Sequence, residues 1–143
     1  MSDDRKWTLA NSMAYTFIAF AGVTDWKLED AEKGAVYSVL RNWCSDKMSN
    51  DDVTTACTTA HGWLLEDLEK DKEAGTIETV ANHMGGLVAW FKEIFEDCEN
   101  PEKMKKFFLG DLVKIAMADD HFHETEKKWI GIVAKQLNVE YQV

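Results

Sequence analysis

The segment DDHFHETE, from Asp119 to Glu126, gathers metal-ligand side chains between two apolar stretches of the chain. Six of its eight residues are Asp, His or Glu. Carboxylate oxygens suit Ca²⁺, Mg²⁺ and Mn²⁺, whereas imidazole nitrogens shift the preference toward Zn²⁺ and other transition metals. The segment is therefore a candidate divalent-cation site.

A second acidic segment lies near the start of the chain. At an offset of 94 residues, Asp25 falls on Asp119 and Glu32 on Glu126. Apolar positions follow the same offset: Leu28 with Phe122, Val36 with Ile130, Val39 with Val133, and Trp43 with Leu137. We interpret the two regions as copies of one helix-corner-helix unit, related by approximate two-fold symmetry.

The elements that would position these corners are helices. Apolar residues recur with a period near 3.6 through the chain, and Pro101 is the only proline. We predict helices at about 7–23, 29–44, 50–70, 76–97, 101–118 and 124–137. Ser49 is the expected N-cap of the third, and Asn100 with Pro101 starts the fifth. Gly85 and Gly86 predict a kink or a close crossing in the fourth.

This pattern predicts an all-α fold: one compact domain of six to seven helices spanning residues 1–143. The repeat units, about 7–45 and 101–139, would flank central helices at 50–98. If the symmetry holds, both corners would contribute to one acidic surface. The candidate metal ligands are Asp25, Glu29 and Glu32 in the first corner, and Asp119, Asp120, His121, His123 and Glu126 in the second.

The same side chains also suit ordinary helix capping, and the two interpretations are compatible. Aspartate after a helix can accept hydrogen bonds from turn N–H groups. Glu32 and Glu126 fall in the first turn of a predicted helix, where carboxylates favour the helix dipole. An EF-hand is excluded, because its twelfth position requires Glu. Counting from Asp25 or Asp119, that position holds Val36 or Ile130.

Composition limits the remaining function classes. The net charge of −10 disfavours nucleic acid and anionic membranes as partners, and favours cations or basic protein surfaces. The polar start predicts no signal peptide, and no run is apolar enough to predict a membrane span. Three widely spaced cysteines indicate reduced thiols in a cytoplasmic protein. The sequence does not indicate the oligomeric state.

Phosphate-loop and dinucleotide-binding motifs are absent from the sequence. Cys57 precedes His61 by one helical turn, which is the spacing that can bring a thiol beside an imidazole. A hydrolase or redox enzyme would also need a deep pocket lined by convergent polar groups. A large pocket around Cys57 and His61 would favour such an enzyme.

Two stretches resemble TerB-like domains, the tellurite-resistance family. The first is FAGVTDWKLEDAEKGAVYSVLRNW, residues 20–43, and the second is IAMADDHFHETEKKWIGIVAKQLNV, residues 115–139. The second keeps the Ala-Asp, apolar and Glu positions of the family pattern at Ala118, Asp119, Phe122 and Glu126. The family's usual glycine after the aspartate is Asp120 here, and Trp26 in the first copy. The small capping residue is replaced by Glu29 and His123.

The resemblance implies a pseudo-symmetric all-α fold, a cytoplasmic setting and an acidic surface that binds metal ions. It also implies membership of a stress-response or tellurite-resistance system, without enzymatic activity. The expected function is a non-catalytic module whose acidic face binds Ca²⁺, Mn²⁺, Mg²⁺ or Zn²⁺, or docks a partner protein. The alternative is a purely structural protein-protein interaction scaffold with no metal site.

Overall fold

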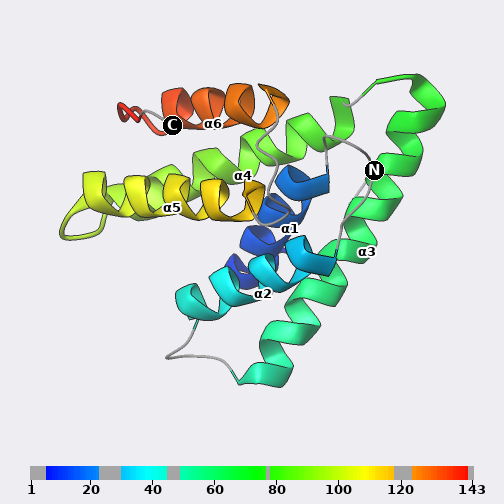
Figure 1. The fold of residues 1–143 in the computed structure, drawn as a ribbon, viewed down its shortest axis with the longest axis horizontal. Helices are drawn as coiled ribbons and strands as arrows, with labels where there is room; N and C mark the ends of the chain where they lie inside the picture. Colours follow the sequence, from blue (N-terminus) through cyan, green and yellow to red (C-terminus); the bar gives the residue numbers. More distant parts are fainter. Residues whose placement is uncertain (1–5, 23–29, 45–48, 77, 118–123, 142–143) are drawn as a thin grey trace.

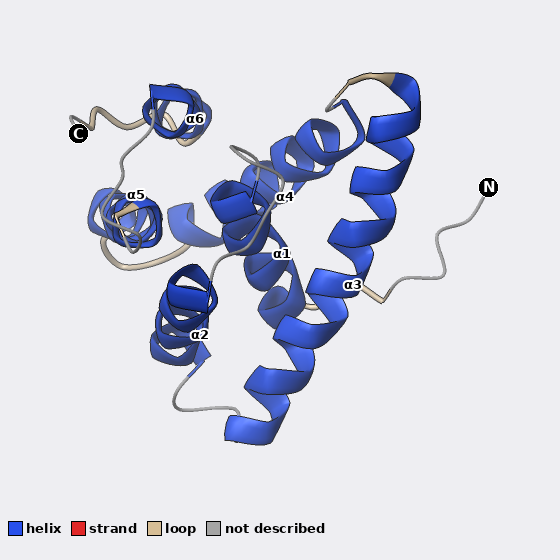
Figure 2. Cartoon of the chain, turned by 45° about the vertical axis from the view of Figure 1, so that its right-hand side comes forward, coloured by secondary structure: helices blue, strands red, loops and turns tan. Residues whose placement is uncertain are grey.

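Six α-helices make up the part of the chain that the computed structural model describes, and no strand occurs in it (Figures 1 and 2). The described residues are 6–22, 30–44, 49–76, 78–117 and 124–141, and the side chains of 22, 30–33, 44 and 125 lie outside the description. The helices are α1 (Leu9–Gly22), α2 (Asp30–Cys44), α3 (Asn50–Ala74), α4 (Glu78–Glu96), α5 (Pro101–Ala116) and α6 (Glu124–Gln136). The predicted all-α single domain is confirmed, with most helix bounds within two residues of expectation.

Helix α1 occupies the centre of the fold. Its sequence, LANSMAYTFIAFAG, contains no charged residue, and every residue from Ala10 to Ala21 is buried. A helix that is apolar on all sides must be surrounded, because no face of it favours water. Accordingly α1 contacts α2, α3, α4 and α5 (Figure 1).

Local capping signals set the ends of α3. Ser49 is its N-cap, and the Ser49 hydroxyl accepts a hydrogen bond from the Asp52 amide at 3.2 Å. Gly75 ends the helix with φ of 70°, in the left-handed region that glycine adopts without steric cost. The chain then turns into α4, which packs against α3.

Helices α5 and α6 form the other end of the chain. Asn100 caps α5 and Pro101 occupies its first turn, as predicted. Helix α4 is continuous through Gly85 and Gly86, and a Cβ added at Gly85 would lie 3.6 Å from the Gln136 side-chain nitrogen. That separation is ordinary van der Waals contact, and a Cβ added at Gly86 would meet no atom within 4 Å, so neither glycine is required by a close helix crossing.

The bounds of the helices follow the sequence offset. Gly22 and Ala116 end α1 and α5, and Asp30 and Glu124 begin α2 and α6, so both pairs of ends are separated by 94 residues. Helix α2 packs on α1, and α6 packs on α5. The matched pairs that are buried in both copies include Ile18 with Leu112, Val36 with Ile130, and Val39 with Val133. The two-fold superposition of the two units stays a prediction.

Candidate functional site

The predicted metal ligands fall mainly outside the described part of the structure. That part excludes Asp25, Glu29, Asp119, Asp120, His121 and His123, and it excludes the side chain of Glu32. Within the described ranges, no group of three or more His, Cys, Asp or Glu residues is placed to hold a metal ion. The cation site at the corners therefore stays a prediction.

Glu126 is the one predicted ligand whose side chain is described. It lies in the first turn of α6 and is 1% exposed. Its neighbour Glu124 is open to solvent, with 88% of its side chain exposed, and pairs with Lys127 at 3.4 Å. The positive end of the helix dipole favours both carboxylates, but only that of Glu126 is removed from solvent. Glu126 therefore faces the protein interior rather than an exposed acidic surface.

A buried polar cluster joins α1, α3 and α4. The Tyr15 hydroxyl of α1 donates a hydrogen bond to Asp67 Oδ2 of α3 at 2.6 Å. The Nδ1 atom of His83, on α4, lies 2.9 Å from the same oxygen. Asp67 and Tyr15 are fully buried, whereas 34% of the His83 side chain is exposed. Both neighbours meet the same carboxylate oxygen, and this contact holds the imidazole with Nδ1 directed inward.

Aromatic rings cover this cluster. The Trp7 ring centroid lies 5.4 Å from Tyr15, 4.6 Å from Trp63 and 5.9 Å from His83. The Trp7 ring packs edge to face on Tyr15 and Trp63, and lies tilted by 54° to the His83 ring. The arrangement ties the segment before α1 to α3 and α4, and it orders an imidazole whose outer edge reaches solvent.

This cluster was not predicted from the sequence, although a signal for it was present. The buried face of α3 contains Ala60 and Leu64, and the same helical stripe continues to Asp67 and Asp71. An acidic residue on an apolar stripe indicates a buried carboxylate with partners. Its partners were not readable, because Tyr15 and His83 lie 52 and 16 residues away in sequence.

Asp71 uses its buried carboxylate to start α4. Its Oδ1 accepts a hydrogen bond from the Thr79 amide at 2.9 Å, and its Oδ2 accepts one from the Val80 amide at 3.0 Å. Burial raises the pKa of Asp71 and so does the nearby Asp67, but the hydrogen bonds from Thr79 and Val80 outweigh both and lower it below 3.8. The ionised form is the one that holds the α3–α4 turn.

Asp111 links α5 to α2 in a different electrostatic setting. Its Oδ2 accepts a hydrogen bond from the Trp43 indole Nε1 at 2.7 Å, and Lys114 Nζ lies 4.0 Å from its Oδ1. Burial raises the pKa of Asp111 above 3.8, and the bond from Trp43 and the charge of Lys114 offset only part of that increase. The ionised form of Asp111 is therefore disfavoured by folding.

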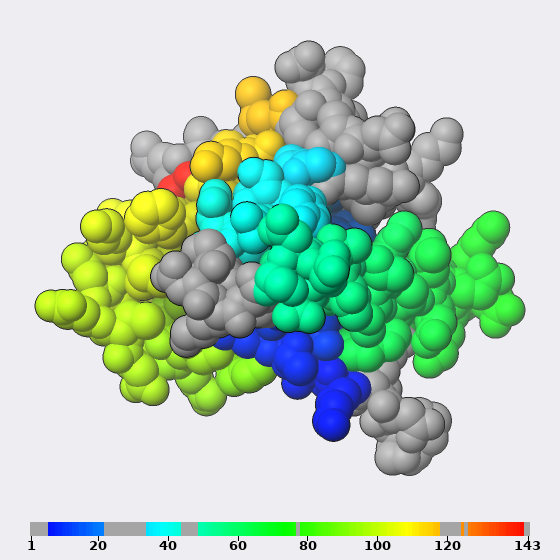
Figure 3. Space-filling model, turned by 90° about the horizontal axis from the view of Figure 1, so that it is seen from below, coloured from blue at the N-terminus to red at the C-terminus, as the bar shows by residue number. Residues whose placement is uncertain are grey.

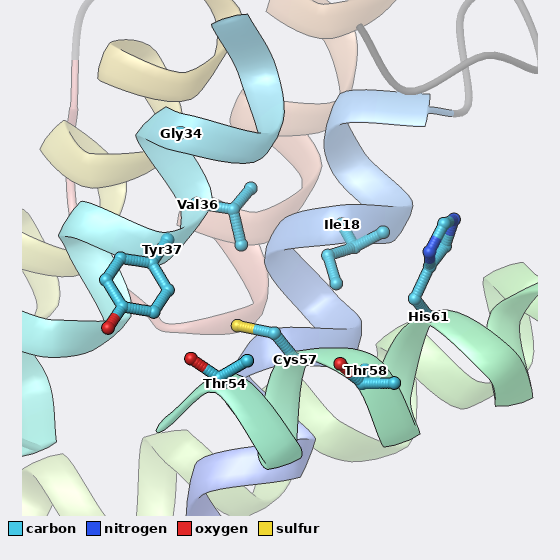
Figure 4. Close-up of a pocket in the computed structure, with 8 residues that line it drawn as sticks. All are labelled: Ile18, Gly34, Val36, Tyr37, Thr54, Cys57, Thr58 and His61. Carbon is cyan, nitrogen blue, oxygen red and sulfur yellow. The ribbon is translucent and has the colours of Figure 1, made fainter. Parts of the chain in front are cut away.

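A pocket of about 380 Å³ lies between α1, α2 and α3 (Figure 4). Its described lining residues are Ile18, Gly34, Val36, Tyr37, Thr54, Cys57, Thr58 and His61. In Figure 4 the Cys57 sulfur points toward α2 and Tyr37, whereas the His61 imidazole lies at the other end of the pocket, beyond Ile18. The pocket around Cys57 and His61 thus exists, with the thiol and the imidazole toward its two ends in this view.

These features define an all-α protein with a charge-free central helix, a buried carboxylate network and one pocket between its first three helices. No protein-family model, curated protein or solved structure matches the chain. The resemblance to TerB-like domains therefore stays a prediction. In the described part of the chain, no helix combines the length and apolar character that crossing a membrane requires.

Proposed function

We propose that the protein is a non-catalytic TerB-like binding module of a stress-response or tellurite-resistance system. Its two acidic corners take up a divalent cation or dock a basic partner protein. The observation that supports this proposal is the agreement of helix bounds: residues 23–29 join α1 to α2, and residues 117–123 join α5 to α6. Connections of equal length between packed helix pairs carry Asp25 and Asp119 at equivalent positions.

Helix polarity adds to the case for a cation. Each corner follows the carboxyl end of a helix, where unpaired carbonyl groups give a partial negative charge. Carbonyl and carboxylate oxygens together are the ligands that hard divalent cations prefer. The last turn of α1 contains no basic residue, whereas the last turn of α5 contains Lys114. The first corner is therefore expected to bind a cation more tightly than the second.

Calorimetric titration of the metal-free protein with Ca²⁺, Mn²⁺ and Zn²⁺ tests the cation site. We expect Asp25→Asn and Asp119→Asn each to weaken binding, with the larger loss for Asp25→Asn. Replacing His121 and His123 together by Ala should reduce the response to Zn²⁺ more than that to Ca²⁺. Glu93→Gln, on an exposed position of α4, is the matched control and should leave every titration unchanged. No heat and no shift in melting temperature with any of the three ions would remove the cation site.

The burial of Glu126 favours a second function, a structural interaction scaffold in which the corners only shape the fold. In that case Glu126→Gln and Asp119→Asn lower the melting temperature and leave any ion response as it was. Loss of ion binding at unchanged thermal stability would instead contradict the scaffold. Measuring melting temperature and titration heat on the same variants separates the two functions.

A further inference from the structure

The pocket between α1, α2 and α3 is a candidate binding site that is independent of the acidic corners. We propose that it binds a small neutral molecule, largely apolar, that bears a hydroxyl group. Its volume of about 380 Å³ lies within the range of about 300–1,000 Å³ typical of small-molecule sites. Figure 3 views the face of the molecule on which α2 and the first half of α3 lie side by side.

One wall of the pocket is apolar and preformed. Ile18 of α1 and Val36 of α2 are 3% and 1% exposed, so the fold holds both side chains in place. Tyr37 adds an aromatic ring beside them, and Figure 4 shows these side chains directed toward α3. Such a wall favours the apolar part of a ligand.

The other wall is polar and belongs to α3. Thr54, Cys57, Thr58 and His61 follow one another at the spacing of a single helical stripe. The adjacent stripe of α3, which includes Val53, Ala60 and Leu64, is buried and apolar. Helix α3 therefore turns a hydrocarbon face to the core and a hydrogen-bonding face to the pocket.

The polar wall selects a neutral ligand with a donor group. Among the described residues that line the pocket there is no Asp, Glu, Lys or Arg, so these residues supply no carboxylate, ammonium or guanidinium group to pair with an ion. The Thr54 hydroxyl donates its proton to the Asn50 carbonyl oxygen at 3.0 Å. Its oxygen is then left with lone pairs, which accept from a donor such as a ligand hydroxyl.

Gly34 keeps the rim of the pocket open. It lies inside α2, where glycine is less stable than alanine. A Cβ added at Gly34 would meet no atom within 4 Å. A larger side chain there can thus be accommodated without clash, and it narrows the pocket without unfolding the helix.

The probe for this site is 2-naphthol, which is neutral at pH 7 and carries one hydroxyl group. Fluorescence titration should give saturable binding with a Kd on the order of 0.1–1 mM, as expected for a fragment of its size. Naphthalene-2-sulfonate has the same ring system and a negative charge, and should bind at least about tenfold more weakly. Absence of saturation by 2-naphthol, or equal affinity for the two probes, would overturn the proposal.

Two controls locate the binding. Gly34→Leu should weaken 2-naphthol binding at least about tenfold, whereas Gly86→Leu, at an exposed glycine of α4 with equal open space, should leave it unchanged. In methyl NMR spectra, 2-naphthol should shift the signals of Ile18 and Val36, and leave the exposed Ile132 in place. Shifts at Ile132 alone, or equal binding by the Gly34→Leu protein, would place the probe elsewhere and refute the site.

The proposed ligand pocket and the proposed cation sites at the corners can be tested independently. None of the described residues that line the pocket belongs to the predicted cation ligands. Asp25→Asn and Asp119→Asn should therefore leave 2-naphthol binding unchanged, whatever they do to the ion titrations.

Discussion

Helices α1 and α5 stand at equivalent positions of the two helix pairs, and their surroundings are opposite. Helix α1 has no charge and is buried from Ala10 to Ala21. Helix α5 buries one face around Phe108 and Leu112, and exposes Lys106 and Lys114 on the other. Figure 2 shows α1 between α2, α3 and α4, whereas α5 lies toward the edge of the molecule. The matched sequence positions therefore coincide with matched helix bounds, whereas the faces that each helix buries differ with its position in the domain.

The largest expected effect tests this difference at one matched pair. At the 94-residue offset, fully buried Phe20 falls on Lys114, whose side chain is 70% exposed. Phe20→Ala should lower the free energy of unfolding by about 3–5 kcal/mol, because it removes a buried ring and leaves a cavity. Lys114→Ala should change it by about 0.5 kcal/mol or less. Urea unfolding of both variants provides the measurement, and similar losses would contradict the assignment of α1 as the central helix.

A second matched pair of residues tests whether α1 and α5 share buried core positions. Ile18 and Leu112 are both buried and fall on each other at the same offset. Ile18→Ala and Leu112→Ala should each cost about 2–5 kcal/mol of unfolding free energy. Chemical denaturation of the two single variants and of the double variant gives these values. A negligible cost for either one would break the proposed equivalence at the core positions.

The comparison extends to two buried aspartates, Asp71 near the end of α3 and Asp111 on α5. Asp71→Ala removes two hydrogen bonds to the first turn of α4, and should cost about 1–2 kcal/mol at pH 7. Because the folded state lowers the pKa of Asp71, its stabilisation is present above pH 3.8 and is lost as the pH falls through the folded pKa. Thermal unfolding between pH 2 and pH 7 should show the variant and the wild type converging at the acid end. A gap that stays constant with pH would exclude ionised Asp71 as the cap.

The smallest effect, and the opposite sign, is expected at Asp111, which matches the buried Phe17 of α1. The folded state raises the pKa of Asp111, so its contribution to stability is greatest below pH 3.8 and is lost as the pH rises through the folded pKa. Asp111→Asn retains an acceptor for the Trp43 indole, and should be as stable as the wild type or more so at pH 7. The difference should narrow as the pH approaches 3.8. A clear loss of stability at pH 7 in calorimetry would show that the charge itself is required.

The parts of the fold that could be predicted depend on neighbours in sequence. Ser49, Asn100 and Pro101 mark helix starts because capping is completed within three residues. The burial of α1 on all sides was not predicted, although its lack of charged residues was a signal for it. The network of Tyr15, Asp67 and His83 could not be predicted, since the sequence does not say which distant helix supplies each partner.

The candidate sites also combine features set by sequence neighbours, which could be predicted, with features set by distant packing, which could not. The spacing of Cys57 and His61 put them on one turn of a helix, and the structure places both at the pocket. The sequence could not show that α1 and α2 leave a space opposite them, because cavity volume depends on how three helices pack. Glu126 was predicted at the start of a helix, whereas its burial depends on what α6 packs against.

The hydrogen bond between Tyr15 and Asp67 has a consequence for the order of folding. It closes a loop of 52 residues, whereas α3 and α4 are joined by a tight turn at Gly75. Closing a long loop costs more chain entropy than closing a short one, and contacts between near neighbours form faster. We therefore expect the α3–α4 hairpin to assemble early and to serve as the template on which the first helix docks, so that refolding is completed by the N-terminal part of the chain.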